Sequence, residues 1–221
     1  MPTLATPSST RARPTRQARS RETLDRLLAS ASEVLGELGL DRTTVPEIAR
    51  RAGVSVGAVY RRFPDKDALL RAVYEEFFAR AGDLNRAALL SLGWGSPSLA
   101  EAVRRTVGSM VWSAWERRDL LRTLLTFAYT HPDAAYRREA EAVSAAALAG
   151  AEPILLRHRD EIPHDDPEAA VRFAMFAAVA TLRAAVLADP GDLPGAAPDA
   201  DTLSTQIGSL FLGYLGIYDG M

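Results

Sequence analysis

The sequence contains no cysteine, and only one of its 26 basic residues is a lysine. Without cysteine the chain cannot form a disulfide framework, a Cys-ligated zinc site or a thiol nucleophile. It also has no run of 18 apolar residues, and its N-terminus lacks the apolar segment of a signal peptide. These absences lead us to expect a cytoplasmic protein that does not span a membrane.

Signs of catalysis or of metal binding are also missing. The sequence shows no Gly-rich phosphate loop, no nucleophile elbow and no paired-carboxylate pattern. Histidines and acidic residues do gather between His158 and Asp166, but without the fixed spacing of a zinc site. We therefore expect neither an enzyme nor a bound metal or cofactor.

Charge is distributed unevenly along the 221 residues, although the formal net charge is only −2. Residues 1–66 hold 12 basic and 7 acidic side chains, whereas the remainder holds 14 basic and 21 acidic ones. With 48% hydrophobic residues, the composition is otherwise that of a soluble globular protein. A basic first third on an acidic body predicts an anionic partner for that end alone.

Apolar residues recur at helical spacing along nearly the whole chain, and no β-hairpin signal interrupts them. This pattern predicts an all-α fold of about nine helices in three parts. Residues 1–17 are rich in Pro, Ser, Thr and Arg, which predicts a disordered basic arm. Residues 18–66 are predicted to form a small three-helix domain, and residues 67–221 a larger helical domain.

Two short helices joined by a tight turn are predicted within residues 43–70. Thr44 opens the first with a capping box, and that helix stops at Gly53. Ser55 can cap the next helix, which we expect over Val56–Phe63. Such a pair matches the helix-turn-helix unit, whose second helix lies in the major groove of DNA.

The second helix of this pair has the side chains that a DNA-reading helix needs. Small residues at its start let the backbone approach the bases, and apolar ones can meet thymine methyl groups. Tyrosine and arginine further on can bind phosphates, which position a protein without reading sequence. The basic arm can touch DNA as well, or it can be merely solvated. The predicted DNA contacts are Arg42, Thr43, Thr44, Ser55, Val56, Gly57, Ala58, Tyr60, Arg61, Arg62 and Lys66.

At this point the run resembles the DNA-binding domain of the TetR family of bacterial transcriptional regulators. The resemblance covers roughly residues 20–75 and implies further features of the family. Its members pair as homodimers through their last two long helices and bind a small molecule within the C-terminal domain. The family often has Thr or Ser where this chain has Ala58, so one hydroxyl contact is missing here. The matching residues are Thr44, Ile48, Ala49, Ala52, Gly53, Val54, Ser55, Gly57, Tyr60, Phe63, Lys66 and Leu69.

The larger domain holds all but two of the aromatic residues, which favours an apolar ligand pocket. Ordinary core packing is the alternative for each of them. The segment from Ala169 to Ala188 is apolar almost all round, so a partner subunit can cover one of its sides. Candidate pocket residues are Phe77, Met110, Trp112, Trp115, Phe127, His131, Phe173 and Phe176. Candidate residues of a dimer interface are Ala174, Ala178, Leu182, Ile207, Leu210, Phe211 and Tyr214.

Together these observations favour a homodimeric regulator of transcription, and most simply a repressor. A small apolar or aromatic effector would release it from a palindromic operator, with the long helix from Asp65 to about Leu90 as the lever. One alternative is an all-α carrier or sensor of hydrophobic molecules that binds no specific DNA sequence. Another is a structural DNA-binding protein that no small molecule releases.

Overall fold

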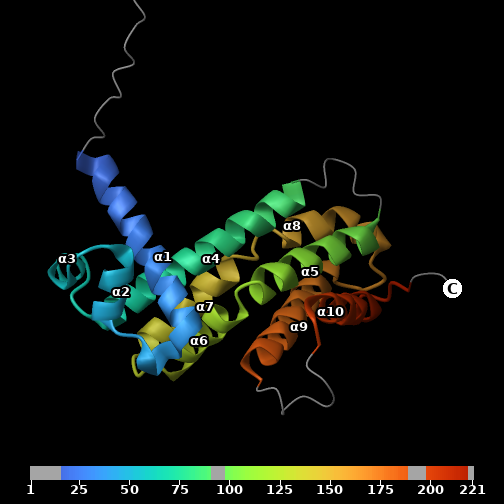
Figure 1. Cartoon of the computed structure of the whole chain (residues 1–221). Coiled ribbons are helices and arrows are strands. Elements are labelled where there is room, and N and C mark those ends of the chain that lie inside the picture. The colour runs from blue at the N-terminus through green and yellow to red at the C-terminus, as the bar shows by residue number, and fades with distance from the viewer. Residues whose placement is uncertain (1–15, 91–97, 189–197, 219–221) are drawn as a thin grey trace, which may run out of the picture.

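The computed structural model describes residues 16–90, 98–188 and 198–218. Within these ranges all regular secondary structure is helical, with ten α-helices and one short 3-10 helix, which confirms the predicted all-α fold (Figure 1). The helices are α1 (Arg16–Arg42), α2 (Val45–Ala52), α3 (Val56–Tyr60), α4 (Lys66–Leu90), α5 (Leu99–Trp115), α6 (Arg118–Thr130), α7 (Ala134–Ala146), α8 (Glu152–Leu155), η1 (Leu156–Glu161), α9 (Pro167–Leu187) and α10 (Ala200–Tyr214).

Helices α1, α2 and α3 lie together at one end of the molecule (Figure 1). Two boundaries differ from the sequence predictions. Helix α1 begins at Arg16, inside the segment predicted as a disordered arm, whereas Arg11 and Arg13 lie outside the described residues. Helix α3 ends at Tyr60 rather than at Phe63, because the chain tightens into a turn there: the backbone N–H of Arg62 donates to the carbonyl of Val59, only three residues back, over 2.9 Å.

Helix α1 packs against the larger domain as well as against α2 and α4. The hydroxyl of Thr123 on α6 donates to the backbone carbonyl of Leu35 over 3.3 Å. A Cβ at Gly36 would lie only 3.6 Å from the Cβ of Leu120, so the two helices approach closely. The buried residues therefore form one continuous core across residue 66, where we predicted a domain boundary.

Helix α4 runs from the α1–α3 end into the middle of the larger domain (Figure 1). Near its start Leu69 and Leu70 are buried where α4 packs against α1. One turn further, the hydroxyl of Tyr74 donates to the backbone carbonyl of Ala140 on α7 over 2.9 Å. The same rigid element thus touches both parts of the molecule.

Helices α9 and α10 pack against each other at the opposite end (Figure 1). By length and composition alone α9 could cross a membrane, since an 18-residue window has a mean hydropathy of 1.7. Only 39% of that window is buried inside the protein. Much of this apolar window of α9 therefore lies outside the core of the protein.

Candidate DNA-binding site and effector cavity

The turn between α2 and α3 depends on Gly53, whose φ of +65° lies in the left-handed region. The N–H of Gly53 donates to the carbonyl of Arg50 over 3.2 Å, and the N–H of Val54 donates to that of Ala49 over 3.0 Å. These two bonds form a Schellman motif that satisfies the last carbonyls of α2. A residue with a Cβ is strained in this conformation, so glycine sets the angle at which α3 leaves α2.

Both helices of the pair begin with the caps that the sequence predicted. The hydroxyl of Thr44 accepts from the N–H of Glu47 over 3.4 Å, and that of Ser55 accepts from the N–H of Ala58 over 3.1 Å. Thr44 and Ser55 are exposed. The first turns of α2 and α3 consequently face outward, where their remaining N–H groups can meet an anion.

An ion-pair network joins α1 to α2 behind this surface. Arg51 binds Glu37 of α1 at 2.6 Å and Glu47 at 2.9 Å, and Arg50 binds Glu47 at 2.7 Å. Hydrogen bonds from Arg50 and Arg51 lower the pKa of Glu47 to about 2, so this carboxylate stays ionised at neutral pH. The network occupies both arginines of α2, which the sequence reasoning had not singled out.

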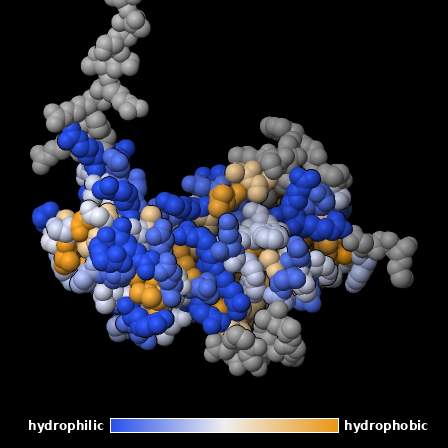
Figure 2. All heavy atoms as spheres, viewed as in Figure 1, coloured by the Kyte–Doolittle hydropathy of each residue, from blue (hydrophilic) through white to orange (hydrophobic). Residues whose placement is uncertain are grey.

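The outer surface of α3 is uncharged at its start and basic beyond its end. Val56, Gly57 and Tyr60 are exposed, whereas Val59 is buried and anchors the helix to the core. Figure 2 shows small hydrophobic areas over this end of the molecule among hydrophilic side chains. Arg61 follows on the exposed side. Backbone, methyl groups, a phenol and a guanidinium are thus offered on one surface.

Three of the predicted DNA contacts are instead engaged within the protein. Thr43 is buried and donates its hydroxyl to the carbonyl of Gly39 over 2.6 Å, so it is not available to a phosphate. The ammonium of Lys66 donates to the carbonyl of Leu40 over 3.0 Å, which closes the end of α1. Arg62 donates to the hydroxyl and carbonyl oxygens of Ser20 over 2.9 and 3.1 Å. Arg42 stays exposed, with a bond from its Nε to the carbonyl of Leu38 in its own helix over 3.1 Å, and Ala58 is half-buried.

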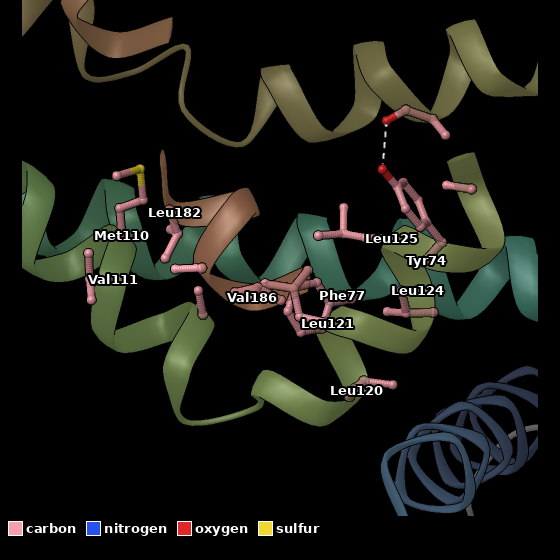
Figure 3. Packing of buried hydrophobic residues seen from close by; sticks show 14 of the residues in the cluster. Tyr74, Phe77, Met110, Val111, Leu120, Leu121, Leu124, Leu125, Leu182 and Val186 are labelled. Carbon is pink, nitrogen blue, oxygen red and sulfur yellow. Dashed lines mark hydrogen bonds between the residues drawn. The ribbon is translucent and has the colours of Figure 1, made fainter. Parts of the chain in front are cut away.

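An apolar cavity of about 70 Å³ lies in the larger domain, between α4, α5, α6, α7 and α9. Figure 3 shows side chains from α4, α5, α6 and α9 converging around it. Two predicted pocket residues, Phe77 and Met110, belong to its wall. The other lining residues are Phe78, Ala81, Asn85, Ser113, Ala114, Leu121, Leu125, Ser144, Ala147, Leu148, Val179, Leu182, Arg183 and Val186.

The remaining predicted pocket residues do not line this cavity. Trp112, Phe173 and Phe176 are exposed on the surface. Trp115 lies half-buried beneath the guanidinium of Arg118. Phe127 and His131 are buried elsewhere, where they pack against the ring of Tyr136. Aromatic content predicted a pocket in the larger domain, but it does not say which side of each helix faces the interior.

His131 instead joins the first turn of α4 to the corner between α6 and α7. Its Nδ1 accepts from the backbone N–H of Asp133 over 3.1 Å, so the proton belongs on Nε2, which donates to Asp67 over 2.9 Å. Arg71 bonds to the same Asp67 over 2.7 Å and lies 4.1 Å above the ring of Tyr136. Burial raises the pKa of Asp67, but hydrogen bonds from Arg71 and His131 outweigh it and hold the pKa below its ordinary value.

A second, surface groove runs between α9 and α10, with a volume of about 210 Å³. Its floor contains four predicted interface residues, Ala174, Ala178, Ile207 and Phe211, which are all buried. Leu210, Tyr214 and Phe173 form exposed apolar rims. Leu182 does not belong to this surface, because it lines the internal cavity, and its side chain lies near that of Met110 (Figure 3).

The charged segment after α8 shows no metal site. Among the residues that the structure describes, no three metal-binding side chains come together. His158 contacts Glu161 at 2.6 Å, and His164 bonds to the carbonyl of Tyr214 over 2.8 Å. These histidines therefore serve local packing between η1, its following loop and α10.

The comparisons with known proteins agree with the geometry of the α1–α3 end. The profile described as "Bacterial regulatory proteins, tetR family" matches residues 27–73. An HTH-type transcriptional regulator of Mycobacterium tuberculosis is 41% identical over 58 residues, which are 26% of this chain and 31% of the relative. The regulator BetI of Escherichia coli is 33% identical over 96 residues, covering 40% and 49%. The chain thus matches only 31% and 49% of the length of these two relatives.

Solved structures extend the likeness to the whole fold. A TetR-family regulator from Mesorhizobium loti superposes with a TM-score of 0.69 at 20% identity and covers 92% of this chain and 98% of its own. The regulator FadR of Bacillus subtilis, in complex with stearoyl-CoA, superposes with a TM-score of 0.67 at 18% identity, covering 86% and 98%. Residues 27–73 thus match the N-terminal domain of the tetR family of bacterial regulatory proteins, and the fold of the chain is similar to that of solved TetR-family regulators.

Proposed function

We propose that this chain is a homodimeric DNA-binding regulator of transcription, most simply a repressor that a small apolar effector releases. The observation that carries the proposal is the capped helix pair, which presents the exposed surface of α3 at one end of the molecule. With Gly57 the backbone of α3 can approach base edges closely. Tyr60 and Arg61 can contact the phosphates on either side.

Pairing of two chains would occur through α9 and α10. The apolar rims and floor of their groove form a continuous surface that a second copy can cover. A twofold dimer needs an operator of two inverted half-sites, spaced by about one helical turn of DNA or more. The exposed side of α9 supports pairing at this place. A second copy of the chain would cover the apolar side chains that make α9 hydrophobic enough to resemble a membrane-spanning helix.

The internal cavity supplies a route from effector to DNA. Phe77, Phe78, Ala81 and Asn85, all on α4, form one of its walls, and the same helix packs against α1. Ligand pockets usually hold about 300–1,000 Å³, so this cavity must widen to accept a whole effector and would displace α4. An effector that binds the widened state more tightly would change the distance between the two DNA-binding domains of the dimer. The FadR structure with stearoyl-CoA supports an apolar ligand in this fold.

Selection from a random duplex DNA pool at about 150 mM salt tests the proposal directly, because non-specific phosphate attraction is already weakened there. We expect recovery of an inverted repeat, and the spacing of its two half-sites would report the distance between the two DNA-binding domains. Recovery of unrelated sequences with weak, salt-sensitive binding would contradict the proposal. In that case the cavity would be explained better by a protein that carries hydrophobic molecules.

The tyrosine on α3 allows a matched test of the contact surface. Tyr60→Ala should weaken binding to the selected DNA while leaving its salt dependence unchanged, because a neutral phenol neutralises no phosphate. Tyr129→Ala is the control, because Tyr129 on α6 is exposed to nearly the same degree, 47% against 49%. Equal affinities for the two variants would remove Tyr60 from the interface. Lys66 is less suitable, since its bond to Leu40 also holds the end of α1.

A further inference from the structure

The internal cavity meets an outer groove of about 370 Å³ on the side of α7 and α9. Four residues line both, namely Ser144, Leu148, Val179 and Arg183. The inner part is almost entirely apolar, whereas the groove carries several charged side chains. A molecule that occupied both would therefore have an apolar end inside and a polar end at this border.

Arg183 at the border has no counter-charge of its own. It is half-buried, and its Nη2 donates to the hydroxyl of Ser144 over 2.7 Å. Within the described part of the chain, no carboxylate lies within ion-pair distance of it. Arg172, further out on the same groove, is already paired with Glu152 at 3.2 Å. The other acidic residue of the groove, Glu141, is exposed to water.

A half-buried guanidinium beside an apolar cavity is costly unless an anion or further hydrogen bonds offset its desolvation. Its planar array of five donors matches a carboxylate or phosphate in bidentate geometry. The bond to Ser144 occupies only one of these donors and leaves the others for a ligand. The narrow cavity behind it suits an alkyl chain better than a fused ring system, since its volume is only about 70 Å³.

We propose that the effector site takes an amphipathic anion, with a linear apolar chain in the cavity and a carboxylate or similar head on Arg183. This rests on the effector site of the proposed function and names the class of ligand for it. The head would lie between α7 and α9, and the chain would extend toward Phe77 and Met110. The extra volume of the chain would press against α4, the helix that leads to the DNA-binding end.

The test compares three probes of equal chain length but different heads, decanoate, decanol and decylammonium, by titration calorimetry on the full chain without DNA. Decanoate should bind at least roughly tenfold more tightly than decanol, since a charge-assisted bond is stronger than a neutral one, and decylammonium should bind most weakly. In Arg183→Gln the preference for decanoate over decanol should disappear while decanol affinity is kept. A merely structural role for Arg183 would lower both affinities together.

Two further variants keep the result interpretable. Arg159→Gln removes an arginine that pairs with Glu168 outside the groove and should leave the preference intact. Val179→Trp fills the passage and should abolish binding of all probes, with folding checked by circular dichroism. Equal binding of decanoate and decanol to the wild type, or no binding of any probe, would overturn the proposal.

The proposed function is tested separately, by measuring how tightly the wild type and the same variants bind the selected DNA. Retained DNA binding without head-group preference would refute only the ligand class. Lost DNA binding with the preference intact would refute only the regulator.

Discussion

Gly53 and Gly57 lie four residues apart and are required for different reasons. Gly53 has a positive φ that the turn between α2 and α3 demands. Gly57 is in an ordinary helical position, and a Cβ there would meet only the Nη1 of Arg61 at 3.9 Å. Nothing inside the protein requires glycine at residue 57, so its absence of a side chain is explained best by an approaching ligand such as DNA.

This difference separates stability from binding at the residue scale. Gly53→Ala should lower the free energy of unfolding by about 1–2 kcal/mol, because its φ is strained for a residue with a Cβ. Gly57→Ala should leave stability unchanged or raise it by up to about 1 kcal/mol, yet weaken DNA binding by roughly 10-fold. Urea unfolding and titration of the selected DNA measure the two effects. Full DNA affinity in Gly57→Ala would mean that α3 does not approach the bases closely.

At the scale of the elements, α4 is held at its start by two independent attachments. Lys66 bonds to the end of α1, and Asp67 bonds to His131 at the corner between α6 and α7. Arg71 completes the second attachment from the next turn of α4. A shift of α4 in response to an effector would have to strain or rearrange these contacts, which makes them part of the proposed coupling.

Asp67→Asn tests the second attachment. The change should lower the free energy of unfolding near neutral pH by about 1 kcal/mol. A buried hydrogen bond to a charged group contributes more than this, but the Asp67 side chain is partly exposed, and water weakens the interaction. Its pKa lies below the ordinary 3.8, so the stabilisation is present above that pH and is lost as pH falls through the lowered pKa. The difference between wild type and variant should therefore shrink in acid.

Thermal unfolding at several pH values measures this dependence. Glu76→Gln is the control, because Glu76 pairs with Arg80 on the exposed side of the same helix. If the loss of thermal stability in Asp67→Asn stayed constant down to low pH, the charge of the Asp67 carboxylate would not be what attaches α4 to the corner between α6 and α7.

The proposed DNA-binding surface on α3 and the proposed pairing surface on α9 and α10 lie at opposite ends of the molecule, and α4 runs from the first end toward the middle (Figure 1). With this separation, an effector that binds in the cavity beside α4 can alter the distance between the two DNA-binding domains without contacting DNA. The same separation also means that disruption of pairing should leave each subunit folded.

Pairing can be tested at the exposed rim of the α9–α10 groove. Leu210→Glu should weaken self-association by roughly 30-fold or more, the effect expected when a central interface residue worth about 2 kcal/mol is lost. Leu84→Glu on α4 is the control, since Leu84 is exposed to a similar extent, 59% against 65%. Sedimentation of both variants over a range of concentrations measures the dissociation constant. A dimer unaffected by Leu210→Glu would move the interface elsewhere.

Local features of this protein could be predicted from its sequence because they depend on neighbours along the chain. The caps at Thr44 and Ser55, the stop at Gly53 and the all-α class all follow from interactions over a few residues. The family resemblance rested on the same stretch, and the comparisons confirmed it.

Other features required the tertiary structure, because helical periodicity shows which residues share a side but not what that side meets. Only packing decided that Thr43 is buried, that Lys66 and Arg62 reach back to α1, and that Trp112 faces solvent. The same holds for the interior. Phe77 and Met110 enclose a cavity whereas Phe173 lines a surface groove, because each position depends on contacts between helices far apart in the chain.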